Sequence, residues 1–89
     1  MLYMIIETFR DGRPEPVYQR VRQRGRLMPA GLDYVASWVT LDGVTCYQVM
    51  ECDDRTLLDQ WIAAWEDLVE FSVMPVITSS EAAARFTPA

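Results

Sequence analysis

Histidine and lysine are both missing from this 89-residue sequence. The lack of histidine excludes a Ser-His-Asp triad, imidazole general-base catalysis and histidine metal ligands. The lack of lysine excludes Schiff-base chemistry. Arginine therefore carries all the side-chain positive charge, and 8 basic against 13 acidic residues leave a net charge of −5. This acidic balance argues against general affinity for nucleic acids or anionic membranes, which both need positive potential.

Cysteines and long apolar runs are also scarce. Cys46 and Cys52 stand on one expected strand, roughly 20 Å apart at the usual rise of a strand, whereas a disulfide needs Cα atoms within about 7 Å. We therefore expect free thiols and a cytoplasmic protein. The segment MLYMIIETFR lacks the basic region of a signal peptide, and no apolar run is long enough to cross a membrane. The length predicts one domain, residues 1–89, whose thin core a partner subunit would complete.

The hydrophobic pattern predicts four strands and two main helices in the order βαββαβ. Strands are expected over residues 2–9, 33–41, 44–52 and 69–78, and helices over 15–27 and around the apolar stripe from Leu57 to Leu68. Residues 79–89 are expected to form a short helix or a tail. Right-handed crossovers turn this order into an α+β ferredoxin-like sandwich, with an antiparallel sheet in the order 4-1-3-2 and both helices on one face. Pro75 places the fourth strand at an edge of the sheet.

An acidic cluster separates the third strand from the second helix, in the stretch ECDD, residues 51–54. Asp53 or Asp54 stands where a helix N-cap is needed, and a carboxylate there accepts hydrogen bonds from free backbone N–H groups. A metal site would need further oxygen ligands, and the sequence has no spaced acidic loop to supply them. We therefore interpret the cluster as a helix cap and expect no metal and no cofactor.

Alternation along the strands divides the side chains between the two faces of the sheet. We expect the face without helices to carry Glu7, because a carboxylate is rarely sealed under helices. The same reasoning gives this face a largely apolar set of side chains: Tyr3, Ile5, Phe9, Tyr34, Ala36, Trp38, Cys46, Gln48, Met50, Ser72, Met74 and Val76. Such a surface indicates an interface or a ligand groove. A second copy that covered it by two-fold symmetry would produce a homodimeric α/β barrel.

The expected cavity between the paired sheets has six candidate ligand-binding residues: Glu7, Tyr34, Trp38, Cys46, Gln48 and Ser72. Aromatic walls with a few polar groups are typical of small-molecule sites. Structural roles stay open, since Glu7 would also pair with an arginine at a rim and Gln48 would hydrogen-bond across a dimer interface. The basic residues between Arg13 and Arg26 either bind an anion or pair with the acids around the second helix.

The stretches RQRGRLMPAGLDYVASWV and CYQVMECDDRTLLDQWIAAWEDLVEF, with MLYMIIETF before them and VMPVITSSEAA after them, resemble a bacterial family filed as domain of unknown function 3303. The likeness runs along nearly the whole chain. It implies a small stand-alone ferredoxin-like protein that is similar to dimeric α/β-barrel proteins. It implies no catalytic residues, because the family has no assigned activity to transfer.

Three functions fit these patterns. The first is a homodimer that binds a small apolar or aromatic molecule between its sheets. The second is a cofactor-free dimeric-barrel enzyme, a monooxygenase or an isomerase, with Glu7 as a base whose pKa desolvation would raise. The third is RNA binding, because RNA-recognition domains share this topology. The strand CYQVMECD, however, lacks the basic and aromatic pattern that stacks bases.

Overall fold

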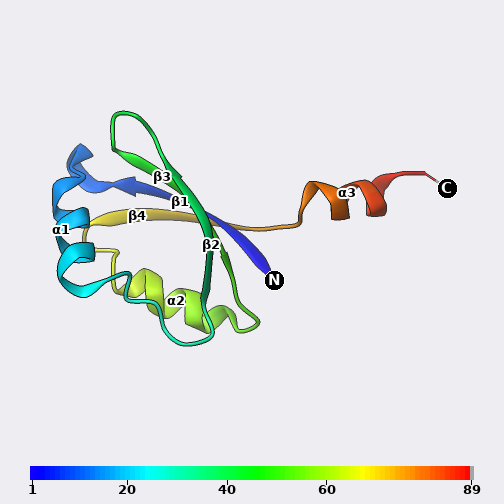
Figure 1. Ribbon diagram of the computed structural model, residues 1–89, viewed down its shortest axis with the longest axis horizontal. Helices are drawn as coiled ribbons and strands as arrows, with labels where there is room; N and C mark the ends of the chain where they lie inside the picture. The colour runs from blue at the N-terminus through cyan, green and yellow to red at the C-terminus, as the bar shows by residue number, and fades with distance from the viewer. Residues whose placement is uncertain (89) are drawn as a thin grey trace.

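The computed structural model of the protein describes residues 1–88, which form a four-stranded antiparallel sheet and three α-helices (Figure 1). The elements follow the predicted βαββαβ order, with a third helix after the last strand. Their bounds are β1 (Leu2–Phe9), a 3-10 turn (Arg10–Gly12), α1 (Glu15–Arg24), β2 (Asp33–Val39), β3 (Thr45–Glu51), α2 (Arg55–Ala63), β4 (Val69–Val76) and α3 (Ser79–Phe86). None of the helices within residues 1–88 is both long and apolar enough to cross a bilayer.

Strand β1 lies in the middle of the sheet, between β3 and β4. The order is β2-β3-β1-β4, and the same order read from the opposite edge is 4-1-3-2. All three pairings are antiparallel. Pro75 therefore lies on an edge strand, where its missing N–H leaves a central ladder intact.

Helices α1 and α2 lie on one side of the sheet (Figure 1), but the side chains beneath them are not the ones expected there. Alternation predicts Glu7 on the uncovered face, whereas Glu7 is buried together with Ile5 and Phe9. The reason is energetic: burying large apolar side chains on one face outweighs the cost of one carboxyl, which takes up a proton when it is desolvated. Cys46, Gln48 and Met50 pair with this set and are buried with it.

A β-bulge in β2 splits the remaining candidates. The register shifts between Tyr34 and Ala36, so that Tyr34 pairs with Met50 on the helix side while Trp38 pairs with Tyr47 on the uncovered side. Ser72 lies on the uncovered side as expected, since it pairs with Ile6. Of the six candidate residues, four therefore face the helices, namely Glu7, Tyr34, Cys46 and Gln48, and only Trp38 and Ser72 face away. We call the side turned away from α1 and α2 the open face.

Helix α1 ends at Arg24, three residues before the predicted end. Gly25 has a φ of 71°, which ends the helix, and its N–H still bonds to the carbonyl of Val21 at 2.8 Å. Because the chain turns here, the loop that follows α1 brings the carbonyl of Arg26 against Trp61 and Trp65 and its guanidinium over the ring of Tyr34.

The acidic cluster has the structural role that the sequence indicates. Asp54 is the N-cap of α2, and its carboxylate accepts the N–H of Thr56 at 2.9 Å and the hydroxyl of the same residue at 2.6 Å. These hydrogen bonds lower the pKa of Asp54. Among residues 1–88 no three Cys, Asp or Glu side chains come together in a way that would hold a metal ion. Cys46 and Cys52 are both free and buried.

Candidate functional site

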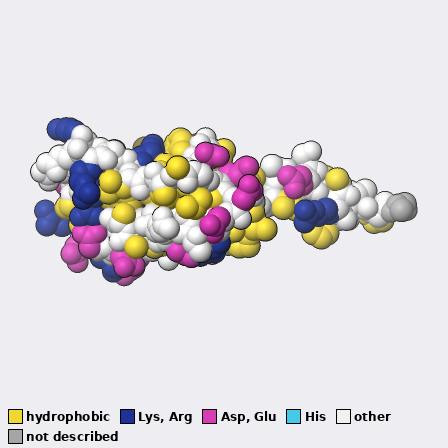
Figure 2. Space-filling view, turned by 90° about the horizontal axis from the view of Figure 1, so that it is seen from below, with side chains coloured by type: hydrophobic (Ala, Val, Ile, Leu, Met, Phe, Trp, Pro, Cys, Tyr) yellow, Lys and Arg dark blue, Asp and Glu magenta, His cyan; other side chains and the backbone are white. Residues whose placement is uncertain are grey.

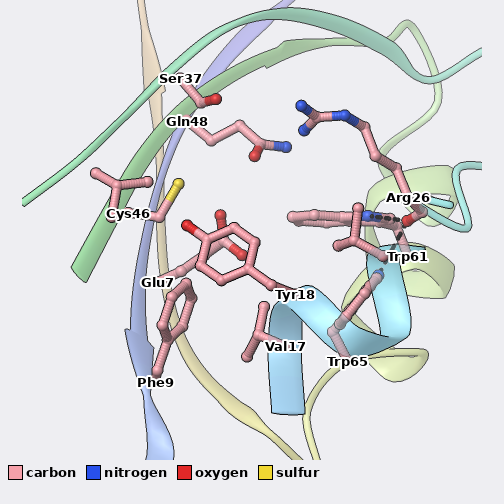
Figure 3. A pocket seen from close by; sticks show the side chains of 12 residues that line it. Glu7, Phe9, Val17, Tyr18, Arg26, Ser37, Cys46, Gln48, Trp61 and Trp65 are labelled. Carbon is pink, nitrogen blue, oxygen red and sulfur yellow. Dashed lines mark hydrogen bonds between the residues drawn. The ribbon is translucent and has the colours of Figure 1, made fainter. Parts of the chain in front are cut away.

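A pocket of about 150 Å³ opens between the sheet and the two helices that cover it (Figure 3). Strands β1, β2 and β3 form one wall, and α1, α2 and the loop after α1 form the other. An apolar cavity of about this volume holds one benzene-sized ring. The lining is mostly apolar with a few polar groups and comprises Glu7, Phe9, Val17, Tyr18, Val21, Arg26, Ser37, Val39, Cys46, Gln48, Trp61 and Trp65.

Two polar side chains that line this pocket each have a buried atom without a hydrogen-bond partner in residues 1–88: Oε2 of Glu7 and Nε2 of Gln48. The residues are only 7% and 4% exposed, respectively. Glu7 pairs with Cys46 and Ile5 pairs with Gln48, so the two polar side chains are diagonal neighbours on the same face. A buried polar group without a partner costs about 1–3 kcal/mol. The pair is therefore a destabilising feature of the fold unless something in the pocket satisfies it.

The carboxyl of Glu7 is poised between its two protonation states. Burial raises its pKa to about 7, while hydrogen bonding from the Cys46 thiol and the positive charge of Arg26 lower it by less. Near neutral pH the group is therefore about half protonated and is able to donate or accept a proton. Burial, together with the charge of Glu7, raises the pKa of Cys46 to about 12. The Cys46 thiol thus stays protonated near neutral pH, which makes it a weak nucleophile.

Tyr18 of α1 closes one side of the pocket. Its ring packs edge-on against Phe9, with 6.1 Å between the ring centroids, and its hydroxyl lies on the same side as Glu7 and Cys46 (Figure 3). Burial and the neighbouring Cys46 and Glu7 raise the pKa of Tyr18. The phenol is therefore neutral at physiological pH and is available as a hydrogen-bond donor or acceptor at the pocket mouth.

Two tryptophans hold the side of the pocket opposite Tyr18 in place. The indole N–H groups of Trp61 and Trp65 both donate to the carbonyl of Arg26 at 3.0 Å, which ties the loop after α1 to α2. The Arg26 guanidinium lies 4.0 Å from the centre of the Tyr34 ring and points toward the amide of Gln48 across the pocket (Figure 3). The site therefore has a flat aromatic wall, Trp61, between the carboxyl of Glu7 and a pair of donors, Gln48 and Arg26.

The structure brings together three of the six residues that the sequence analysis singled out, Glu7, Cys46 and Gln48, in a place other than the expected one. Their pocket lies inside one chain, under the helices. Tyr34 touches the site through Arg26, whereas Trp38 and Ser72 lie on the open face, outside the pocket. Sequence patterns assign no site role to Tyr18, Ser37 or Trp61, and they indicate Arg26 only as part of a basic cluster that binds an anion or pairs with acids. The tryptophan was recognised as part of the apolar stripe of α2, but the pattern of one helix does not show which strand residues it faces.

The arginines around α1 are in part ion-paired. Arg20 forms a two-pronged salt bridge with Asp67 at 2.6 and 2.7 Å, donates to the carbonyl of Ala64, and lies over the ring of Trp65. Arg10, which comes before α1, forms a second salt bridge with Glu70 at 3.1 Å. Basic and acidic side chains lie side by side at this end of the molecule (Figure 2). For these arginines the structure favours charge pairing over an anion site.

Comparison of the sequence with curated proteins gave no match, and neither did comparison with solved structures. The family model described as a domain of unknown function, DUF3303, matches residues 1–89. That match covers every residue of the sequence, so the chain belongs to this family.

Proposed function

We propose that this protein binds a single-ring, mainly apolar molecule that carries a carbonyl group next to a hydrogen-bond donor. The observation that carries the proposal is the pair of buried, unpaired atoms in the pocket, Oε2 of Glu7 and Nε2 of Gln48. A ligand carbonyl would accept from Gln48, and a ligand N–H or O–H would donate to the ionised carboxylate of Glu7. The ligand would thereby remove the cost of two buried unsatisfied groups, which a purely apolar ligand leaves in place.

The rest of the lining sets the size and shape of this ligand. The volume of about 150 Å³ admits one aromatic or alicyclic ring with small substituents. Such a ring would pack against the face of Trp61 and the side chains of Phe9 and Val17, which supply most of the apolar contact. The exposed guanidinium of Arg26 adds positive charge at the mouth, so a polar substituent is expected to point there.

Benzamide tests this proposal, because its amide offers both a carbonyl and an N–H. We expect calorimetry to show that benzamide binds and that toluene, which has the ring alone, binds at least about tenfold more weakly. Gln48→Leu should weaken benzamide binding by about tenfold or more and leave the binding of toluene unchanged. Ser72→Ala is the matched control, since Ser72 lies on the open face and its loss should change neither affinity. Equal affinity of the wild type and the Gln48→Leu variant for benzamide would refute the proposed contact.

The titration of Glu7 favours a second candidate function, cofactor-free proton transfer of the isomerase type. A carboxyl with a pKa of about 7 inside an apolar pocket is suited to remove a proton from carbon and return it. In such a step the C–H bond next to a ligand carbonyl breaks, the proton moves to Glu7, and the electron pair forms an enolate whose oxygen Gln48 stabilises. Return of the proton to a different carbon completes the isomerisation without an oxidant. A monooxygenase reaction would in addition need dioxygen as a substrate.

Conversion of 3-cyclohexenone to its conjugated 2-isomer tests this second function, because the product absorbs in the ultraviolet. We expect a rate above that of buffer alone, and we expect Glu7→Gln to lower it by about 100-fold or more. The rate should fall below about pH 7 as Glu7 becomes protonated. Ser72→Ala should again have no effect. Turnover that survives in the Glu7→Gln variant would exclude Glu7 as the base, and benzamide binding without any turnover would leave ligand binding as the function.

We also propose that the chain has a ferredoxin-like fold and that two copies pair through their open faces as a dimeric α/β barrel. The βαββαβ order and the antiparallel sheet support the fold. The composition of the open face supports the pairing, because its outward set is largely apolar: Leu2, Met4, Ile6, Trp38, Tyr47, Val49, Met74 and Val76. In such a dimer each subunit keeps its own ligand pocket on the outer, helix-covered side.

A further inference from the structure

The chain continues beyond the last strand of the sheet. After β4, residues 77–88 continue roughly in line with that strand and stand away from the body of the molecule, with α3 at their centre (Figures 1 and 2). We call residues 77–88 the arm. Helix α3 has no buried residue, and of its eight side chains only Ala82 is even partly covered. The arm is also the reason why the molecule extends 51 Å in one direction but 30 and 17 Å in the others (Figure 2).

Helix α3 is well formed locally but has one apolar side that is left largely exposed in residues 1–88. Thr78 caps its first turn by accepting the N–H of Glu81 at 3.1 Å. At 100° per residue, Ala82, Ala83 and Phe86 fall on one side and Glu81 and Ala84 on the other. Phe86 is 76% exposed. An isolated helix of eight residues is marginal in water and takes most of its stability from packing an apolar side, so α3 needs a surface to pack on.

A second unpartnered surface lies on the same chain. The open face exposes large apolar side chains, with Trp38 60% exposed and Tyr47 and Met74 each 41% exposed. At the base of the arm this face continues into a groove of about 510 Å³ with a mostly apolar floor. The groove is lined by Met1, Leu2, Glu51, Pro75, Val76, Ile77, Glu81 and Arg85. Leu2 and Val76 belong to both surfaces, so the open face and the groove form one continuous apolar region.

We propose that the arm is exchanged between two copies of this chain: the open faces pack together about a two-fold axis, and each α3 lays its Phe86 side on the sheet edge of the other subunit. This inference rests on the proposed pairing of the open faces. The partner in this proposal is a second copy of the chain. A two-fold axis presents each open face with the arm of the other chain, so one closed contact covers both unpartnered surfaces on both chains.

The area of the open face and that of the arm both contribute to what a dimer contact requires. Four strands about 4.8 Å apart and about seven residues long give the sheet a face of on the order of 450 Å² in projection. A stable dimer buries about 800 Å² of accessible surface on each partner. The pleated face exposes more accessible surface than its projection, so the open face supplies a large part of this area and the arms add to it. A helix of eight residues is about 12 Å long, and one such helix from each subunit adds contact beyond the edge of the sheet.

The test compares the full chain with a chain that stops after Val76, both studied by light scattering over a range of concentrations. We expect the full chain to have twice the mass of one chain and the shortened chain to dissociate at a concentration about tenfold higher or more. Phe86→Ser should weaken the dimer in the same direction, whereas Ala84→Ser, on the opposite side of α3, should not. A photoreactive benzoylphenylalanine at position 86 should give a covalent dimer on illumination, with the cross-link on the partner's sheet.

The outcomes separate the two parts of the proposal. A full chain that is monomeric at high micromolar concentration overturns the pairing of the open faces and the exchange together. A full chain that is dimeric, with Phe86→Ser equally dimeric and cross-links only within one chain, overturns the exchange alone and leaves the pairing of the sheets. The Phe86→Ser and cross-linking results decide the question even if the shortened chain does not fold. Ligand binding is independent of both, since the pocket lies on the other side of the sheet.

Discussion

Glu7→Gln is expected to stabilise the folded protein by about 3 kcal/mol near pH 8 and by less than about 1 kcal/mol near pH 5. The ordinary pKa of 4.5 applies in the unfolded chain, and burial raises the pKa of Glu7 to about 7 in the folded one. The pKa values in the folded and unfolded chain differ by about 2.5, and a difference of one pKa unit corresponds to about 1.4 kcal/mol, which gives that magnitude. Glutamine keeps the shape of the side chain and has no charge to desolvate.

The sign follows from which state holds the proton more tightly. Below about pH 4.5 Glu7 is protonated in both states and contributes nothing to the pH dependence. Between about 4.5 and 7 the unfolded chain loses the proton while the folded chain retains it, so the stability of the wild type falls as the pH rises. Above about 7 the loss is complete. The carboxyls of Asp42, Asp54 and Asp67 have lowered pKa values and lose their stabilising effect only in more acidic solution, outside this window.

Urea unfolding at a series of pH values between about 5 and 8.5 measures this effect. The wild type should lose stability across the series and the Glu7→Gln variant should not. Glu51→Gln is the matched control, since it removes the same kind of charge from an exposed position at the end of β3 and should leave the pH dependence of the wild type in place. Parallel curves for the wild type and Glu7→Gln would mean that the carboxyl is not desolvated in solution.

Leu58→Ala is expected to cost about 3 kcal/mol of folding stability, within a usual range of about 2–5 kcal/mol for such a change. Leu58 lies in α2, is 0% exposed, and belongs to the core between that helix and the sheet. Its truncation removes apolar contact and leaves a cavity that neighbours on a rigid sheet fill poorly. For a chain of this size the expected loss is a large share of a total stability of roughly 4–13 kcal/mol.

Leu41→Ala is the control for this prediction, because it deletes the same atoms from a fully exposed side chain in the loop between β2 and β3. Its effect should stay within about 0.5 kcal/mol. Denaturant midpoints for the two variants, with unchanged slopes, give the comparison directly. A loss below about 1 kcal/mol for Leu58→Ala would place α2 outside the main core and would remove the support for the pocket wall that Trp61 forms.

The elements that the sequence predicts well depend on local chemistry. A run of residues that favour strands produces β1 from Leu2 to Phe9, and an i, i+3/i+4 apolar spacing produces α2. The side chain of Asp54 caps that helix through a residue two positions away. The βαββαβ order then follows from the sequence of elements, and Pro75 marks an edge strand because it lacks an N–H. Each of these inferences uses contacts within a few residues, where the sequence itself supplies both partners.

The pocket depends on contacts between distant segments. Alternation sorts the side chains of β1 into two sets, but it does not say which set the helices cover. The single carboxyl of Glu7 does not outweigh its apolar neighbours Ile5 and Phe9, which are buried with it. The bulge after Tyr34 reverses the alternation of β2, and the turn at Gly25 brings Arg26 over the site. The sequence by itself determined the elements and their order. Only the packing of α1 and α2 decided that Glu7 and Gln48 meet in one pocket, because the apolar area of a whole sheet face outweighs the preference of any single residue in it.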